Sequence, residues 1–473
     1  MGAGLSGIDA AYHVQRCFPG KAYAVLESRT ELGGTWSLFR YPGIRSDSDM
    51  FTLGFPFYPW RGAKSIADGA SIRAYITDAA RQFGIDRHVR FRHLARSAAW
   101  DSREALWRVQ VAVGEAGEPQ EIACRFLYLC TGYYDYANGH APAFPGETAF
   151  RGERVHPQFW PEGFDYRGKQ VVIIGSGATA ITLVPAMAKE AAHVTMLQRS
   201  PSYIASLPSC DALADRLRRW LPARLAHQLV RTKQIAFSLF TFQLARRRPD
   251  LVRRALRKVQ RSILGRGYDI DRHLTPTYQP WDQRLCLVPD GDLFYALRDG
   301  RASIVTEHIE RFTEHGIRLR SGVELPADVI VTATGLKLLP GGGMRLSVDG
   351  QPVDLGATYA YQGVMLGNVP NLAFCVGYIN ASWTLRADLA SRFVCRVLRY
   401  MARKGHREVR PRCLPETLLP SPLLDFAAGY VQRSVDEFPK QGPRLPWRFR
   451  QNFLLDGWAL RWRRLRDGTL EFR

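Results

Sequence analysis

The sequence predicts an α/β fold with two parallel-sheet domains, because one local pattern occurs twice within its 473 residues. Each copy is a glycine-rich turn, then a stretch compatible with a helix, then an apolar stretch compatible with a strand. The first copy begins at Gly2, and the second follows the apolar stretch "QVVII" at residues 170–174. This order is that of a Rossmann unit, in which the turn holds a pyrophosphate at the N-terminus of the helix. The expected fold class is therefore α/β, with two Rossmann-like dinucleotide-binding domains.

The first turn reads G-x-G-x-x-G, with glycines at Gly2, Gly4 and Gly7. A predicted helix, "IDAAYHVQR", follows, and then a predicted strand, "KAYAVLE", that ends at Glu27. An acidic side chain at the end of the second strand can accept hydrogen bonds from ribose hydroxyls. A dinucleotide with free ribose hydroxyls suits this turn, and the prediction is FAD.

The second turn has Gly175, Gly177 and Ala180 in the same spacing, and its second strand, "HVTMLQ", ends at Arg199 and Ser200. A cation and a hydroxyl at this position can neutralise and hydrogen-bond a 2′-phosphate. The second turn is therefore predicted to bind NADPH.

Two further apolar strands end in small-residue turns, "RFLYLCTG" at Gly132 and "ADVIVTATG" at Thr334 and Gly335. One follows each glycine-rich unit, as expected where a chain crosses between two domains beside a cofactor. The predicted organisation is an FAD domain split around an NADPH domain. The expected boundaries are 1–140 for the first part of the FAD domain, 141–330 for the NADPH domain with a basic helical insertion at about 209–272, and 331–473 for the second part of the FAD domain with a basic tail.

The strand that normally precedes the first glycine-rich turn is absent from the sequence, because Met1 stands directly before Gly2. In a doubly wound sheet this strand is central and aims the phosphate-binding turn. Two expectations arise. Either the natural protein begins on the order of ten residues upstream in an apolar stretch, since a strand has about five or six residues, or this chain binds FAD poorly.

The eight cysteines are scattered, with no C-x-x-C pair and no clustering with histidines. This pattern argues against a dithiol reductase and against a zinc protein, so no metal site is predicted, and it suggests reduced thiols in a cytoplasm. No apolar run approaches the roughly 18 to 20 residues of a membrane span. The predicted location is cytoplasmic.

The net charge of +21 calls for an anionic partner, and much of it lies between Asp211 and Arg272, where 16 Lys and Arg face 5 acids. Basic and apolar residues alternate there at roughly helical spacing. One interpretation is a solvated helical insertion, and the other is a patch that binds an anionic membrane surface on the inner face of the cell membrane. Nucleic acid is disfavoured, because no nucleic-acid-binding module accompanies the charge.

A motif between the two domains contains Phe150, Gly152, His156 and Trp160, followed by Pro161. It resembles the F-x-G-x-x-x-H-x-x-x-W-P signature of the class B flavoprotein Baeyer–Villiger monooxygenases. Flavin-containing N- and S-oxygenases carry Tyr where this chain has Trp160.

A second stretch, "GGTWSLFRYPGIRSD", matches the same family's G-x-W-x4-Y-P-G-x3-D motif. The resemblance covers essentially the whole chain. It implies a cofactor site that includes Gly34, Thr35, Trp36 and Asp47, and a fingerprint histidine, His156, that organises domain motion. Trp36 and Trp160 are expected to pack rather than to react.

The family resemblance also implies the chemistry. FAD is reduced by NADPH, O2 forms a C4a-peroxyflavin, and this adduct converts ketones to esters or lactones; oxidation of thioamide or sulfide sulfur is also expected. Arg284 is the expected catalytic group that holds developing negative charge, and Asp47 orients it, since a guanidinium stays protonated and presents fixed donors. The family has Lys where this chain has Gln283, which weakens the expected selection for NADPH.

Two alternative functions stay open from the sequence. One is a flavin-containing N- or S-oxygenase. The other is a catalytically impaired, truncated flavoprotein that acts as a basic membrane-peripheral protein.

Overall fold

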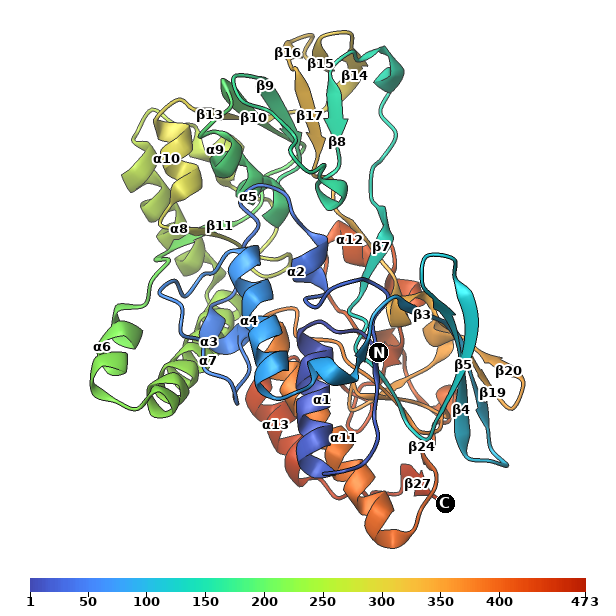
Figure 1. Ribbon diagram of the computed structural model, residues 1–473. Coiled ribbons are helices and arrows are strands. Elements are labelled where there is room, and N and C mark those ends of the chain that lie inside the picture. The colour runs from blue at the N-terminus through green and yellow to red at the C-terminus, as the bar shows by residue number, and fades with distance from the viewer.

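The computed structural model describes residues 1–473. Most of the middle of the chain, green to yellow in Figure 1, forms the upper part of the molecule, and the helical residues 212–247, also green, extend down beside the lower part. The N-terminal and C-terminal segments, blue and orange to red, come together in the lower part. These arrangements confirm the predicted α/β class with two Rossmann-like units; the expected domain boundaries stay a prediction.

The upper part contains a five-stranded sheet in the order β13-β10-β9-β17-β8, and every neighbouring pair is parallel. Its strands are β8 (Glu153–Val155), β9 (Gln170–Ile174), β10 (His193–Gln198), β13 (Ala302–Thr306) and β17 (Val329–Thr332). Strands β9 and β17 are almost entirely buried, as expected of a parallel sheet covered on both faces. Helices α5 (Ala178–Met187) and α10 (Asp292–Arg298) pack with this sheet in one apolar core.

The lower part joins both ends of the chain through two helices, α1 (Leu5–Cys17) and α11 (Trp383–Lys404), which pack against each other. Strand β6 (Leu127–Leu129), from the first half, pairs in parallel with β23 (Leu372–Phe374), from the second half. A mixed five-stranded sheet, β20-β19-β3-β4-β5, covers another side. Its strands are β3 (His93–Asp101), β4 (Leu106–Val113), β5 (Glu118–Cys124), β19 (Arg345–Val348) and β20 (Gln351–Val353).

The predicted strand at residues 21–27 forms only β1 (Val25–Leu26), paired with β2 (Val89–Arg90). On the other side of β1 lie the first two residues of the chain, Met1 and Gly2. The Gly2 amide donates to the Leu26 carbonyl (2.8 Å), the N-terminal amine of Met1 donates to the Tyr128 carbonyl (2.7 Å), and the Cys130 amide donates to the Met1 carbonyl (2.8 Å). Met1 and Gly2 therefore lie between β1 and β6.

The predicted basic insertion forms four helices, α6 (Ala212–Trp220), α7 (Ala223–Arg247), α8 (Pro249–Leu264) and α9 (Ile270–Leu274). The buried Arg231 of α7 fastens this segment to the lower part, donating to the carbonyls of Phe51 (2.6 Å) and Gly54 (2.8 Å). None of the chain's helices combines the length and the apolar character needed to cross a membrane.

Two extended segments connect the upper and lower parts, β7 (Tyr134–Gly139) and β18 (Leu336–Leu338), and they pair antiparallel. The remaining helices include α2 (Thr35–Leu38), α3 (Met50–Leu53), α4 (Gly69–Gln82), α12 (Gly429–Gln432) and α13 (Phe453–Trp462). The remaining strands are β11 (Ile204–Leu207), β12 (Cys286–Pro289), β14 (Ile309–Thr313), β15 (Gly316–Leu319), β16 (Glu324–Pro326), β21 (Ala360–Tyr361), β22 (Met365–Leu366), β24 (Val409–Pro411), β25 (Ser421–Pro422), β26 (Lys440–Gln441) and β27 (Leu470–Phe472).

Candidate active site

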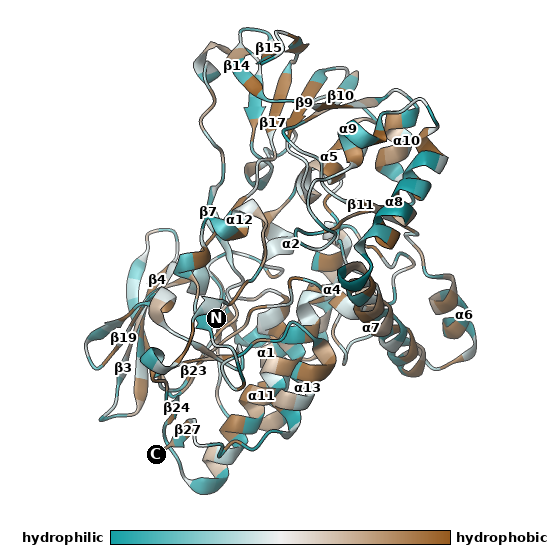
Figure 2. Cartoon of the chain, turned by 180° about the vertical axis from the view of Figure 1, so that it is seen from behind, coloured by the Kyte–Doolittle hydropathy of each residue, from teal (hydrophilic) through white to brown (hydrophobic).

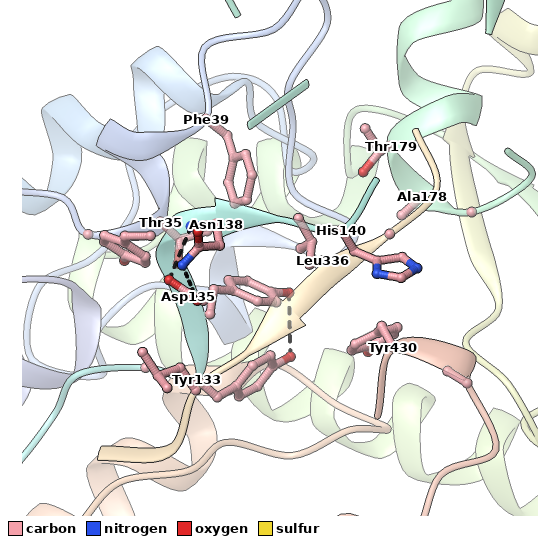
Figure 3. A pocket seen from close by; sticks show the side chains of 18 of the residues that line it. Thr35, Phe39, Tyr133, Asp135, Asn138, His140, Ala178, Thr179, Leu336 and Tyr430 are labelled. Atoms are coloured by element: carbon pink, nitrogen blue, oxygen red, sulfur yellow. Dashed lines mark hydrogen bonds between the residues drawn. The ribbon is translucent and has the colours of Figure 1, made fainter. Parts of the chain in front are cut away.

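One cavity of about 1730 Å³ brings both glycine-rich turns together. Residues from α2, β7, α5, β18 and α12 surround it in Figure 3. Most residues that the sequence singled out line this cavity: Gly2, Gly4, Glu27, Gly34, Thr35, Trp36, Asp47, Gly175, Gly177, Arg199, Ser200, Arg284, Thr334 and Gly335.

The third position of each turn does not line the cavity, because it is used for packing. A Cβ on Gly7 would stand 1.7 Å from the Gly2 carbonyl oxygen, so only glycine fits there. Ala180 is fully buried in the core of the upper part. Gly7 and Ala180 therefore pack on the side of each turn that faces away from the cavity.

At the first turn, α1 begins after Gly4, and no side chain caps its first amides. Such an uncapped N-terminus is a ready site for an anion. The buried Glu27 carboxylate accepts hydrogen bonds from the amides of Ala3 (2.7 Å) and Arg29 (3.0 Å), which holds the turn against the end of β1.

At the second turn, α5 begins after Gly177, again with no side-chain cap. A Cβ on Gly177 would meet nothing within 4 Å, so the turn is open on the side of the cavity. Arg199 and Ser200 follow β10 directly and are exposed. The upper turn thus combines free amides with an exposed cation.

Asp47 and Arg284 form a two-point ion pair in the cavity wall. The Arg284 Nη2 donates to Asp47 Oδ1 (2.8 Å), and the Nε lies 2.6 Å from Oδ2. Burial acts to lower the pKa of the Arg284 guanidinium, but the Asp47 carboxylate outweighs it and the pKa is raised. The guanidinium therefore stays charged while its cavity side remains available as a donor.

Three tyrosines, Tyr133, Tyr134 and Tyr430, line the cavity close enough to influence the pKa of Arg284. The hydroxyls of Tyr133 and Tyr134 lie 3.5 Å apart (Figure 3), and Tyr133 packs on the ring of Trp383 with centroids 5.0 Å apart. Burial raises the pKa of all three hydroxyls, so they are neutral. The sequence motifs did not indicate these residues. Tyr133 and Tyr134 directly follow the crossing at Gly132 and could have been suspected, whereas nothing in the sequence marks Tyr430.

The fingerprint residues Phe150, Gly152, His156 and Trp160 do not line the cavity. The ring of His156 packs against Gly139, the last residue of β7, and its Nδ1 accepts from the Gln158 amide (3.2 Å). Burial lowers the pKa of His156. Among these residues, His156 lies beside a connecting segment, whereas Phe150 and Trp160 pack against the apolar cores of the upper part. Their roles stay a prediction.

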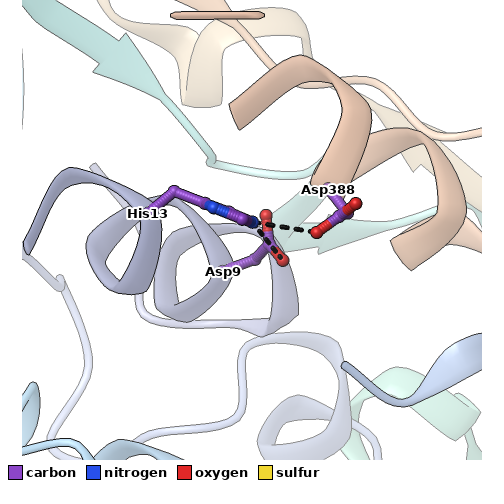
Figure 4. A group of neighbouring side chains, drawn as sticks. All are labelled: Asp9, His13 and Asp388. Atoms are coloured by element: carbon purple, nitrogen blue, oxygen red, sulfur yellow. Dashed lines mark hydrogen bonds and ion pairs between the residues drawn. The ribbon is translucent and has the colours of Figure 1, made fainter. Parts of the chain in front are cut away.

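A second titratable group, Asp9, His13 and Asp388, is buried between α1 and α11 (Figure 4). The His13 Nε2 lies 2.8 Å from Asp388 Oδ1 and 3.9 Å from Asp9 Oδ1. Burial raises the pKa of Asp9 to about 7. The cluster links the helix of the first turn to the C-terminal half of the chain.

The site can hold two extended anionic ligands with their ends in one cavity, and it offers a charged donor between them. Comparisons with known proteins agree with a site for two dinucleotide cofactors. A family model described as flavin-binding monooxygenase-like matches residues 55–214. A solved cyclohexanone monooxygenase structure covers 100% of this chain and 98% of its own, with a TM-score of 0.77 and 19% identity. A steroid monooxygenase bound to NADP covers 88% and 87%, with a TM-score of 0.73 and 23% identity.

Curated relatives match the full length. The FAD-containing monooxygenase EthA of Mycobacterium tuberculosis is 51% identical over 473 residues, which is 100% of this chain and 96% of the relative. A probable FAD-binding monooxygenase, AlmA of Acinetobacter baylyi, is 47% identical over 100% of this chain and 95% of its own length. The chain belongs to the family of FAD-containing monooxygenases that includes EthA. Its class as a flavoprotein monooxygenase, predicted from the sequence, is confirmed.

Proposed function

We propose that this chain uses FAD, NADPH and O2 to insert an oxygen atom into ketones, and that it also oxidises thioamide or sulfide sulfur. NADPH supplies two electrons, one oxygen atom enters the substrate, and the other leaves as water. The observation that carries the proposal is the Asp47–Arg284 ion pair in the wall shared by both glycine-rich turns.

The residues fit the two dinucleotides. Gly2, Gly4 and the first amides of α1 would hold the FAD pyrophosphate, with Glu27 at its ribose. Gly175, Gly177 and the first amides of α5 would hold NADPH, with Arg199 and Ser200 at its 2′-phosphate. When bound, the flavin supplies hydride acceptance and activation of O2.

The protein's own contribution is electrostatic. Oxygen attack on a carbonyl carbon creates negative charge on the carbonyl oxygen, and Arg284 presents fixed donors in the cavity where that charge develops. Asp47 occupies two of those donors and so sets the orientation of the guanidinium. The neutral hydroxyls of Tyr133 and Tyr430 can donate hydrogen bonds in the same wall without adding charge.

Product analysis tests the proposal. The purified protein is incubated with NADPH, O2 and either phenylacetone or methyl phenyl sulfide, and products are separated by gas chromatography. An ester from the ketone together with a sulfoxide supports it. A sulfoxide without any ester favours the flavin-containing S-oxygenase alternative, and absence of flavin absorbance favours the catalytically impaired alternative.

A further inference from the structure

The outer face of α13 carries large apolar side chains on the molecular surface. Leu454, Leu455, Trp458 and Trp462 are 63%, 47%, 58% and 68% exposed. Their spacing places them along one side of a single helix. Single exposed apolar residues are common, but a contiguous stripe with two tryptophans marks a binding surface.

The orientation of α13 is fixed by its inner face. Asp456 is buried and accepts a hydrogen bond from the Tyr378 hydroxyl (2.9 Å), and Arg386 lies 3.5 Å from the same carboxylate oxygen. Arg396 of α11 donates to the carbonyl of Leu460 (3.0 Å). The helix cannot turn its tryptophans inward without breaking these buried polar contacts.

Helix α7 lies next to α13 and also carries exposed apolar side chains. Both helices appear on the same side of the molecule in Figures 1 and 2, and residues of both, including Leu239 and Phe453, line one small cavity between them. On α7, Phe237 and Phe240 are 48% and 64% exposed.

The exposed charged side chains of α7 and α13 themselves are basic. Helix α7 contains no Asp or Glu, and the only acidic residue of α13 is the buried Asp456. Arg461, Arg464 and Arg466 are exposed on or just after α13. At the end of α7, Arg247 is exposed, and Arg246 pairs with Asp282 (2.6 Å). A second copy of this chain would bring the same arginines face to face, which is unfavourable. Anionic lipid complements both features, because tryptophan and leucine enter the headgroup boundary while arginines meet phosphate.

We propose that the outer faces of α13 and α7 form a surface that docks on an anionic lipid bilayer. The sequence pattern indicates a membrane patch only within residues 209–272, and α13 adds a second group of exposed apolar side chains outside that segment. Docking is independent of the proposed oxygenation chemistry, since none of these side chains lines the active-site cavity.

The test is co-sedimentation of the FAD-loaded protein with vesicles of phosphatidylcholine alone or enriched in phosphatidylglycerol. We expect salt-sensitive binding to the anionic vesicles. The double variant Trp458→Ala, Trp462→Ala should lower the partition coefficient about tenfold or more, because two apolar anchors are lost. Arg461→Glu with Arg464→Glu should weaken anionic binding selectively. Val323→Ala, exposed at the far end of the upper part, should bind like the parent protein.

Flavin content and thermal unfolding of each variant establish that it is folded. Equal partition of the tryptophan variant and the parent would overturn the proposal. So would equal binding of the parent to both vesicle types. Concentration-dependent dimerisation without vesicles, lost in the tryptophan variant, would assign the surface to a second copy instead.

Discussion

The Arg284 guanidinium and the Asp47 carboxylate meet in a two-point ion pair, although 237 residues separate them in the chain. Asp47 comes after the short helix α2, and Arg284 precedes β12, so the pair joins the lower part to the upper part across the cavity. The ion pair lines the cavity that both glycine-rich turns share, so Arg284 is placed to act on a substrate bound there.

Replacing Arg284 by Ala should leave flavin reduction by NADPH intact while nearly abolishing ester formation. Loss of one donor to a developing oxyanion costs about 3 to 4 kcal/mol, or roughly a hundred- to thousandfold in rate. Stopped-flow absorbance measures flavin reduction, and the yields of ester and of hydrogen peroxide measure the oxygenation step. Arg301→Ala, an exposed arginine outside the cavity, is the control. Undiminished ester formation would remove Arg284 from the mechanism.

Replacing Arg199 by Ala should reduce the preference for NADPH over NADH. Only NADPH loses a charge-assisted hydrogen bond, and such a bond contributes about 1.5 to 3 kcal/mol, or roughly ten- to a hundredfold. The ratio of kcat/KM for the two cofactors is the measurement, with Arg301→Ala again as the control. If the ratio does not change, another group recognises the 2′-phosphate.

Stability should fall as pH rises from about 5 to 8, owing to the cluster in Figure 4. Burial raises the pKa of Asp9 from 3.8 to about 7. Although burial alone would lower it, the pKa of His13 is raised by its hydrogen bond to Asp388 and by the charge of Asp9. Both groups bind protons more tightly in the folded state than in the unfolded state. Their contribution to the free energy of unfolding is therefore complete at low pH, and it is lost as the pH rises through their pKa values in the folded state. Asp9→Asn should flatten this dependence and raise Tm most at pH 8, as measured by calorimetry across the range. A Tm gain that is larger at pH 5 than at pH 8 contradicts the assignment.

Replacing Arg231 by Met should destabilise the contact between α7 and the lower part. Arg231 is buried and donates to the carbonyls of Phe51 and Gly54, which would lose their partner. Each buried acceptor left unsatisfied costs about 1 to 3 kcal/mol. Urea unfolding should show the loss, and limited proteolysis should cleave residues 209–272 sooner. Arg224→Met, exposed near the start of the same helix, should change neither. Unchanged proteolysis of the Arg231 variant would show that this contact does not hold the insertion in place.

The amino-acid sequence by itself determined the two glycine-rich turns and the family, and most of the candidate site residues that it indicated line the cavity. These signals are local: glycine spacing, a strand's apolar run, and the residue at a strand's end each depend on a few neighbours along the chain. Gly2, Glu27, Gly175 and Arg199 could therefore be predicted from position alone.

Only the tertiary structure decided what surrounds Arg284 and which side chains stay in solvent. Tyr430 reaches the cavity because α12 folds back from the C-terminal half, and no local pattern encodes that return. The exposure of Trp458 and Trp462 likewise depends on the tertiary structure. An amphipathic helix predicts an apolar face, but which face is covered depends on packing against α11, where the buried Asp456 leaves the tryptophans outside.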